Sequence, residues 1–149
     1  MPISEKTSDV VCLLNVIREG GRRTKDGSVE GAIRLQKLVF LAREENVPIT
    51  YRFDAYYFGP YSEEITRDIG FLKDLGFIDV IEETGISSTG KIIPKRSYKI
   101  TKEGLKFLSR YKISENINEK ISNIMEEYSS LSISQIVEES LKRWPIPAK

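Results

Sequence analysis

Apolar residues recur at intervals of three or four in six segments of the chain, and this spacing predicts six amphipathic helices. In the first of them, Val10, Leu13, Leu14 and Ile17 fall on one face. In the second, the apolar stripe leaves Lys37 on the polar side. The six segments are residues 8–19, 29–45, 62–75, 102–111, 117–128 and 133–141.

Short polar residues mark where three of these helices begin. Ser62, Thr101 and Ser132 each precede a periodic segment, and their hydroxyl oxygens accept hydrogen bonds from free helix N–H groups. Gln135 follows Ser132 by three positions, which is the spacing of a capping box. Gly76 ends the third helix.

An aromatic stretch, YRFDAYYFGPY (51–61), shows the period of a strand instead. Tyr51, Phe53, Ala55 and Tyr57 alternate with polar or exposed positions, so we expect these four side chains to point into the core. Gly59 and its neighbours form the turn that follows. A surface on which RNA bases stack is the less favoured interpretation, with Tyr56, Tyr57 and Tyr61 as its exposed rings.

A β-hairpin is expected after the third helix. Residues 77–83 and 96–100 read as its two strands, and TGISSTGKIIPK (84–95) as a glycine- and serine-bearing loop between them. The fold class is therefore mainly α with a small β-hairpin. Three helices, a hairpin and a capped fourth helix follow the order of a winged helix-turn-helix domain.

Composition removes several classes of function. The 149 residues contain no histidine and one cysteine, Cys12, so a Cys–His nucleophile, an ordinary zinc site and an intrachain disulfide are all excluded. No phosphate-binding glycine loop of standard spacing is present. We therefore expect no enzyme activity, no metal and no cofactor. The lone cysteine and the absence of a signal-like or membrane-spanning segment indicate a cytoplasmic protein.

Two segments of the sequence resemble a known family. RLQKLVFLAREE (34–45), followed by YYFGPYSEEITRDIGFLKDLGFI (56–78), is similar to the YwgA-like proteins and, more distantly, to the Panacea domain of antitoxins. The shared features are a Leu-Gln-Lys-Leu helix, an aromatic strand that ends in Gly-Pro, and a following helix. SYKITKEGLKFL (97–108) resembles the strand-to-helix junction after the wing of many bacterial and archaeal winged-helix regulators. The resemblance implies a winged-helix fold, and Panacea domains neutralise toxins through protein contacts.

Two parts of the chain are expected to have different roles. Residues 1–112 hold the full set of winged-helix elements, and residues 113–149 form a helical extension. The isoleucine-rich stripes within 115–143 predict either a homodimer seam or helices that complete the core.

The net charge of +1 means that any nucleic-acid site must be a local patch. We expect DNA binding in the manner of a transcriptional regulator, with the third helix in the major groove and the hairpin on the backbone. Thr66, Arg67 and Lys73 on the helix, and Lys91, Lys95 and Arg96 on the hairpin, are the predicted contacts.

A protein-interaction module without DNA contact is the alternative. Residues 62–74 carry four carboxylates and only two cations, with Glu63 and Glu64 at the end of the helix that would meet the bases. Phosphates repel such carboxylates, whereas a protein partner need not.

Overall fold

The structure, a computed structural model, describes residues 5–144 and has a mixed α/β fold. Within this range the helices are α1 (Glu5–Gly21), α2 (Ala32–Glu44), α3 (Glu63–Asp74), α4 (Lys102–Arg110), α5 (Glu115–Tyr128) and α6 (Ile133–Arg143). The strands are β1 (Val29–Glu30), β2 (Asp54–Tyr56), β3 (Gly59–Tyr61), β4 (Ile78–Ile86) and β5 (Ile92–Ile100). None of these helices combines the length and the apolarity needed to cross a bilayer.

Each of the six predicted helices is present, and the caps predicted for α3, α4 and α6 are confirmed. Ser62, Thr101 and Ser132 accept hydrogen bonds from the backbone N–H groups three positions later, and Gln135 completes the capping box. α1 begins at Glu5 and not at residue 8, so its predicted start is wrong. The second helix begins at Ala32 and not at residue 29. The prediction for its first residues is wrong, because Val29 and Glu30 pair with β5 as a short strand.

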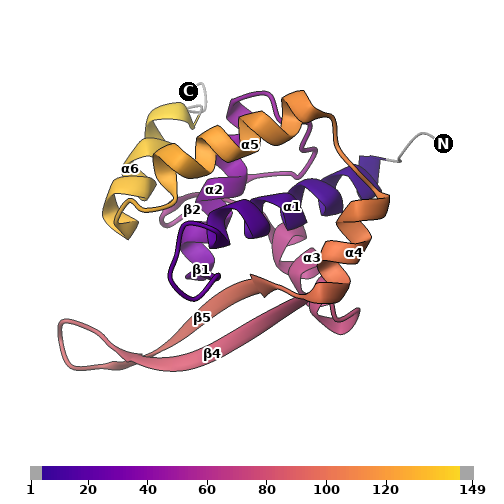
Figure 1. Cartoon of the computed structure of the whole chain (residues 1–149). Helices are drawn as coiled ribbons and strands as arrows, with labels where there is room; N and C mark the ends of the chain where they lie inside the picture. The colour runs from indigo at the N-terminus through magenta and orange to yellow at the C-terminus, as the bar shows by residue number, and fades with distance from the viewer. Residues whose placement is uncertain (1–4, 145–149) are drawn as a thin grey trace.

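The main sheet has the strand order β1-β5-β4, and both pairings are antiparallel. The hairpin is longer than predicted: its strands pair from Ile78↔Ile100 out to Ile86↔Ile92, so only residues 87–91 form the turn. Figure 1 shows this hairpin extending well beyond the helices. The expected loop at 84–95 is therefore mostly strand.

The aromatic stretch follows the expected alternation only in its first half. Tyr51 and Phe53 are buried as predicted, but Ala55 is exposed and Tyr57 is 95% exposed. β2 and β3 form a small separate hairpin, and Tyr57 lies in its turn. The prediction that Tyr57 belongs to the core is wrong, because a turn residue leaves the sheet that would have buried it.

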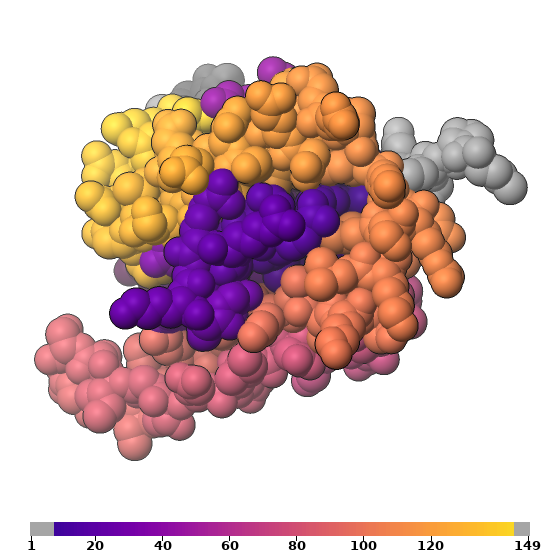
Figure 2. Space-filling view, in the orientation of Figure 1, coloured from indigo at the N-terminus to yellow at the C-terminus, as the bar shows by residue number. Residues whose placement is uncertain are grey.

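The two C-terminal helices lie on α1 and α2, which form the centre of the core. Figure 2 shows α5 and α6 covering one side of the molecule, with α1 between them and the hairpin. Most of their apolar side chains are inside: the buried ones are Ile121, Ile124, Met125, Tyr128 and Ile136, whereas Ile133 and Leu141 of α6 are exposed. Core completion, one of the two alternatives, thus accounts for these stripes. Homodimerisation through 115–143 stays a prediction, and the apolar surface left for it on these helices is small, with Ile133 and Leu141 as its exposed large side chains.

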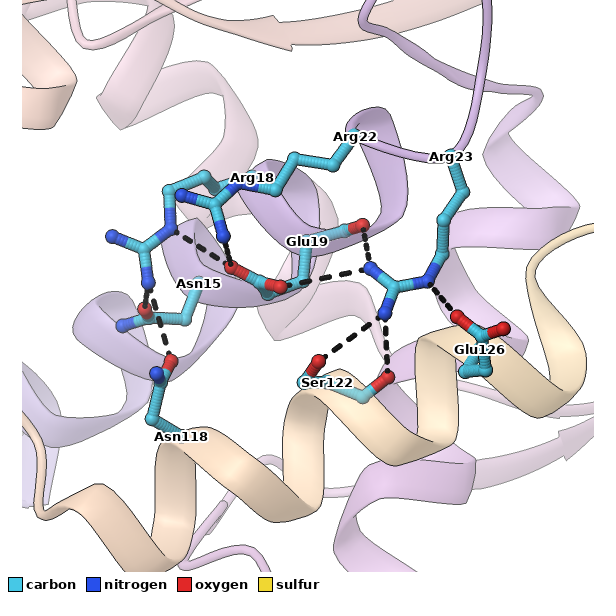
Figure 3. Close-up of polar contacts among 8 residues, drawn as sticks. All are labelled: Asn15, Arg18, Glu19, Arg22, Arg23, Asn118, Ser122 and Glu126. Carbon is cyan, nitrogen blue, oxygen red and sulfur yellow. Dashed lines mark hydrogen bonds and ion pairs between the residues drawn. The ribbon is translucent and has the colours of Figure 1, made fainter.

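A polar seam also fixes α5 to α1 (Figure 3). Glu19 is buried at the end of α1, and its carboxylate pairs with Arg22 at 2.8 Å and with Arg18 at 3.3 Å. Arg23 contacts the same carboxylate and also bonds the backbone oxygen of Ser122 on α5 at 3.1 Å. The basic residues at the start of the 22–31 loop therefore serve packing, with their guanidinium groups already engaged.

Candidate macromolecule-binding surface

The N-terminus of α3 is held by the two motifs that the resemblance singled out. The side-chain amide of Gln36 donates to the backbone oxygen of Ser62 at 2.9 Å and accepts from its N–H at 2.9 Å. Lys37 donates from Nζ to the backbone oxygen of Pro60 at 2.7 Å. The Gln-Lys pair on α2 thus fixes the Gly-Pro-Tyr-Ser segment that leads into α3.

Lys37 does not lie on the polar side of α2, as the stripe had predicted. It is 1% exposed, and burial lowers the pKa of its ammonium group from 10.5 to about 8. The apolar pattern failed here because a lysine stem can pass through a core when its terminal nitrogen reaches a backbone oxygen. Both motif residues are accordingly structural, and neither faces solvent.

Three of the six predicted contact residues line one cleft between α3 and the hairpin. Thr66 and Lys73 come from α3, and Arg96 comes from β5. The cleft has a volume of about 220 Å³. Gly70 also lines it, at a position where a Cβ atom would have no neighbour within 4 Å. Arg67, Lys91 and Lys95 do not line this cleft, although all three are exposed.

The hairpin cations are paired with carboxylates that the linear sequence did not place nearby. Arg96 pairs with Glu82 across the hairpin at 3.2 Å, and Lys95 pairs with Glu30 on β1. This contact with Glu30 raises the pKa of Lys95 above its usual value. On α3, Arg67 lies 3.8 Å from Glu64. The predicted basic patch is thus interspersed with carboxylates.

Three exposed isoleucines lie on the outer half of the hairpin. Ile86 and Ile92 are each 76% exposed, and Ile93 is 44% exposed. A groove of about 740 Å³ runs from this part of the hairpin to the starts of α2 and α6. Its apolar lining consists of Ala32, Ile33, Ile86, Ile93, Pro94 and Ile133.

Sequence reasoning missed these isoleucines because it predicts a loop over residues 84–95. The signal that could have found them is the short turn SSTG with Ile86 before it and Ile92-Ile93 after it. In the structure, Ser87 donates its N–H to the oxygen of Lys91 at 2.8 Å and closes the turn there. Strand pairing therefore continues through Ile86 and Ile92.

Comparison with known proteins gives one informative relative. The chain is 27% identical over 125 residues to "Uncharacterized protein YwgA" of Bacillus subtilis (strain 168), covering 78% of this chain and 72% of the relative. No family model matches the chain. The similarity supports the resemblance to YwgA-like proteins, and the name of that relative assigns it no activity.

Proposed function

We propose that this protein is a protein-binding module, built on a winged-helix arrangement, that contacts its partner through the outer half of the β4–β5 hairpin. The observation that carries the proposal is the exposure of Ile86 and Ile92 on a hairpin that projects from the body of the molecule (Figure 1). An isolated two-stranded hairpin is marginally stable in water, and exposed apolar patches on soluble proteins mark interaction sites.

Charge supports a protein partner more than DNA. α3 carries four carboxylates and two cations, and residues 78–100 carry four cations and three carboxylates. Together they give no net positive charge with which to release counterions from DNA. Isoleucine side chains gain nothing from phosphate, whereas they contribute at the core of a protein interface.

The winged-helix arrangement is itself part of the proposal. α1, α2 and α3 followed by a hairpin give the expected element order, and β1 adds a third strand. The chain departs from a helix-turn-helix between α2 and α3, where residues 45–62 contain the β2–β3 hairpin in place of a turn of 3–4 residues. The resemblance to Panacea domains, which act through protein contacts, agrees with the proposed function.

Affinity capture from native extract tests the proposal. We expect the full chain to capture a protein whether or not the extract is treated with nuclease. An Ile86→Lys, Ile92→Lys double variant should reduce capture at least roughly tenfold, as loss of central interface residues does. Leu105→Lys is the matched control, because Leu105 is 44% exposed on α4. Capture that nuclease abolishes, or that both variants reduce equally, would contradict the proposal.

DNA binding is the second candidate, and one observation favours it: Thr66, Lys73 and Arg96 line the same cleft between α3 and the hairpin. A fluorescence-anisotropy titration at several salt concentrations tests it. Lys91→Ala should lower the salt slope by about one unit if Lys91 contacts phosphate, and Arg67→Ala should relax preference at one base pair if Arg67 reads guanine. Absence of salt-dependent binding by the unmodified chain at low salt would eliminate this candidate.

A further inference from the structure

Strand β4 forms an open edge of the three-stranded sheet. The strand order is β1-β5-β4, so β5 is covered on both sides near its C-terminal end, and no strand within residues 5–144 lies on the far side of β4. Figure 1 shows β4 along the lower border of the molecule. A nine-residue edge of this kind is long, and strands of such length are usually shielded in soluble proteins.

Backbone hydrogen bonds at the two ends of the hairpin determine which groups of β4 face outward. At one end the N–H of Thr101 bonds the oxygen of Phe77 at 3.0 Å, and at the other the N–H of Ser87 bonds the oxygen of Lys91 at 2.8 Å. In an antiparallel ladder the paired residues alternate between bonded and non-bonded. The odd-numbered residues of β4 therefore bond β5, and the even-numbered ones direct both N–H and C=O away from it.

Those even-numbered positions are accessible. Glu82, Thr84 and Ile86 are exposed and Val80 is half-buried. No proline interrupts β4, so each of these residues has an N–H to donate. The outer edge of β5 is different, because Pro94 occupies one of its outward positions and Gly31 bonds the oxygen of Arg96 at 2.7 Å. One edge of the hairpin is blocked and the other is open.

Side-chain charge restricts what can add to the open edge. β4 carries Asp79, Glu82 and Glu83, all exposed, and no cation. On the face opposite to Val80 and Glu82, Ile81 stands between Asp79 and Glu83 and is 39% exposed. Like charges placed opposite each other destabilise a strand pair, and opposite charges stabilise it. A second copy of β4 would bring carboxylates against carboxylates, and β5 of a second copy is blocked by β1 and Pro94.

The geometry points to β4 as a site where an extended, basic segment of a partner protein adds a fourth strand to the sheet. Three strands then become four, with main-chain bonds to Val80, Glu82, Thr84 and Ile86. The pattern that complements Asp79, Ile81 and Glu83 is basic–x–apolar–x–basic. This inference rests on the proposed protein-binding function, and it specifies that the partner contributes an extended, basic segment.

A peptide of defined sequence tests the site on the full chain. The probe is an acetylated, amidated heptapeptide with lysine, valine and lysine at its second, fourth and sixth positions and threonine elsewhere. The control replaces both lysines with glutamate. We expect the lysine peptide to bind roughly tenfold more tightly than the glutamate peptide, because two cross-strand charge pairs change sign.

Amide hydrogen exchange, followed residue by residue by NMR, locates the bound peptide. Exchange at Val80, Glu82 and Thr84, the outward-facing residues that the heptapeptide can reach, should slow when the lysine peptide is added, while exchange at Ile81 stays unchanged. A strand added to β4 produces this alternation, and a charge-only contact does not. Slowing elsewhere, or at odd and even positions alike, would overturn the inference.

Two further variants test the main-chain bonds. Thr84→Pro removes one outward N–H without removing a β4–β5 bond, and Thr84→Ala keeps the N–H. We expect the proline variant alone to lose binding. A lysine peptide that is N-methylated on the groups facing β4 should also fail to bind the unmodified chain, and this arm does not depend on how a variant folds. Equal binding by the methylated peptide would overturn the inference.

The edge site and the proposed function can fail separately. If partner capture depends on Ile86 and Ile92 but the peptide gives no alternating protection, the hairpin binds its partner by side chains and the edge inference is wrong. If capture also fails to depend on those isoleucines, the proposed function falls with it.

Discussion

The side-chain amide of Gln36 bonds both backbone groups of Ser62, donating to its oxygen and accepting from its N–H, each at 2.9 Å. Both residues are buried, at 3% and 0% exposure. The bond pair joins α2 to the N-cap of α3 across the β2–β3 hairpin. It fixes where α3 begins, and thereby where the cleft-lining residues of α3 lie.

Gln36→Leu should therefore destabilise the protein strongly. The substitution keeps the volume but leaves the N–H and C=O of Ser62 buried without partners, at a cost of about 2–4 kcal/mol in free energy of unfolding. Urea denaturation measures this. Gln135→Ala is the control, because Gln135 makes a similar bond to the backbone N–H of Ser132 at an exposed site and should cost about 0.5–1 kcal/mol. Equal losses for the two variants would contradict the role of Gln36.

Lys37 makes stability depend on pH in a defined direction. Burial lowers its pKa in the folded state to about 8, from 10.5 in the unfolded chain. Between these values the unfolded state binds more protons, so the free energy of unfolding rises with pH across this window. Below pH 8 Lys37 is protonated in both states, so the full cost of burying its charged ammonium group lowers the free energy of unfolding.

The test compares the unmodified chain with Lys37→Met by urea denaturation between pH 7 and about 10.5. The difference between the two should change by roughly 2–3 kcal/mol in favour of lysine as pH rises. The tyrosine and cysteine groups are common to both chains and cancel. A difference that does not vary with pH would show that Lys37 titrates normally.

Two tyrosines of the aromatic stretch should differ in how much their mutation destabilises the protein. Tyr51 is 2% exposed and donates its hydroxyl to the carboxylate of Asp68 at 2.7 Å, and Asp68 is buried too. Tyr51→Phe should cost about 1–3 kcal/mol, because a buried carboxylate loses its donor. Tyr57→Ser should stay within about 0.5 kcal/mol, because its ring is in solvent. A large loss for Tyr57→Ser in thermal or urea unfolding would restore the interpretation of that residue as core.

Removal of residues 113–149 should abolish cooperative unfolding. These residues supply Ile121, Ile124, Met125, Tyr128 and Ile136 to the core. Loss of a buried side chain of this size costs about 2–5 kcal/mol, and whole-domain stability is about 5–15 kcal/mol. Circular dichroism with urea measures the transition. A truncated chain ending at Lys112 that still unfolds cooperatively would support a separate N-terminal domain with a dimerising extension.

The helices and their caps could be predicted from sequence because local rules set them. Ser62, Thr101 and Ser132 needed only nearby N–H groups, and those contacts are present. β1 could not be predicted, because its two residues become a strand only when β5, distant in sequence but paired through the register Val29↔Tyr98, lies beside them. The prediction that Tyr57 is buried was wrong for a related reason. Alternation predicts which face of a strand a side chain takes, but not where the strand ends.

The binding surface was predictable in part. The sequence placed Thr66, Lys73 and Arg96 on a helix and a hairpin that the structure brings to one cleft. It did not reveal that Glu82 and Glu30 would pair with the hairpin cations, because that depends on strand register and on β1. The exposed isoleucines were also missed, because the sequence predicted a loop over residues 84–95 where the structure has strands. Their exposure, which depends on how far the hairpin extends from the body, is a property of the tertiary structure.

Site-specific photo-crosslinking tests most directly the claim that the hairpin binds a protein. Benzoylphenylalanine is placed at Ser88 in the hairpin turn, or at Glu119 on α5 as the control; both positions are exposed. The chain is irradiated in native extract and then treated with nuclease. We expect a nuclease-resistant crosslink to a polypeptide from position 88 and none from position 119. A crosslink from position 88 that nuclease removes, or equal protein crosslinks from both positions, would contradict this claim.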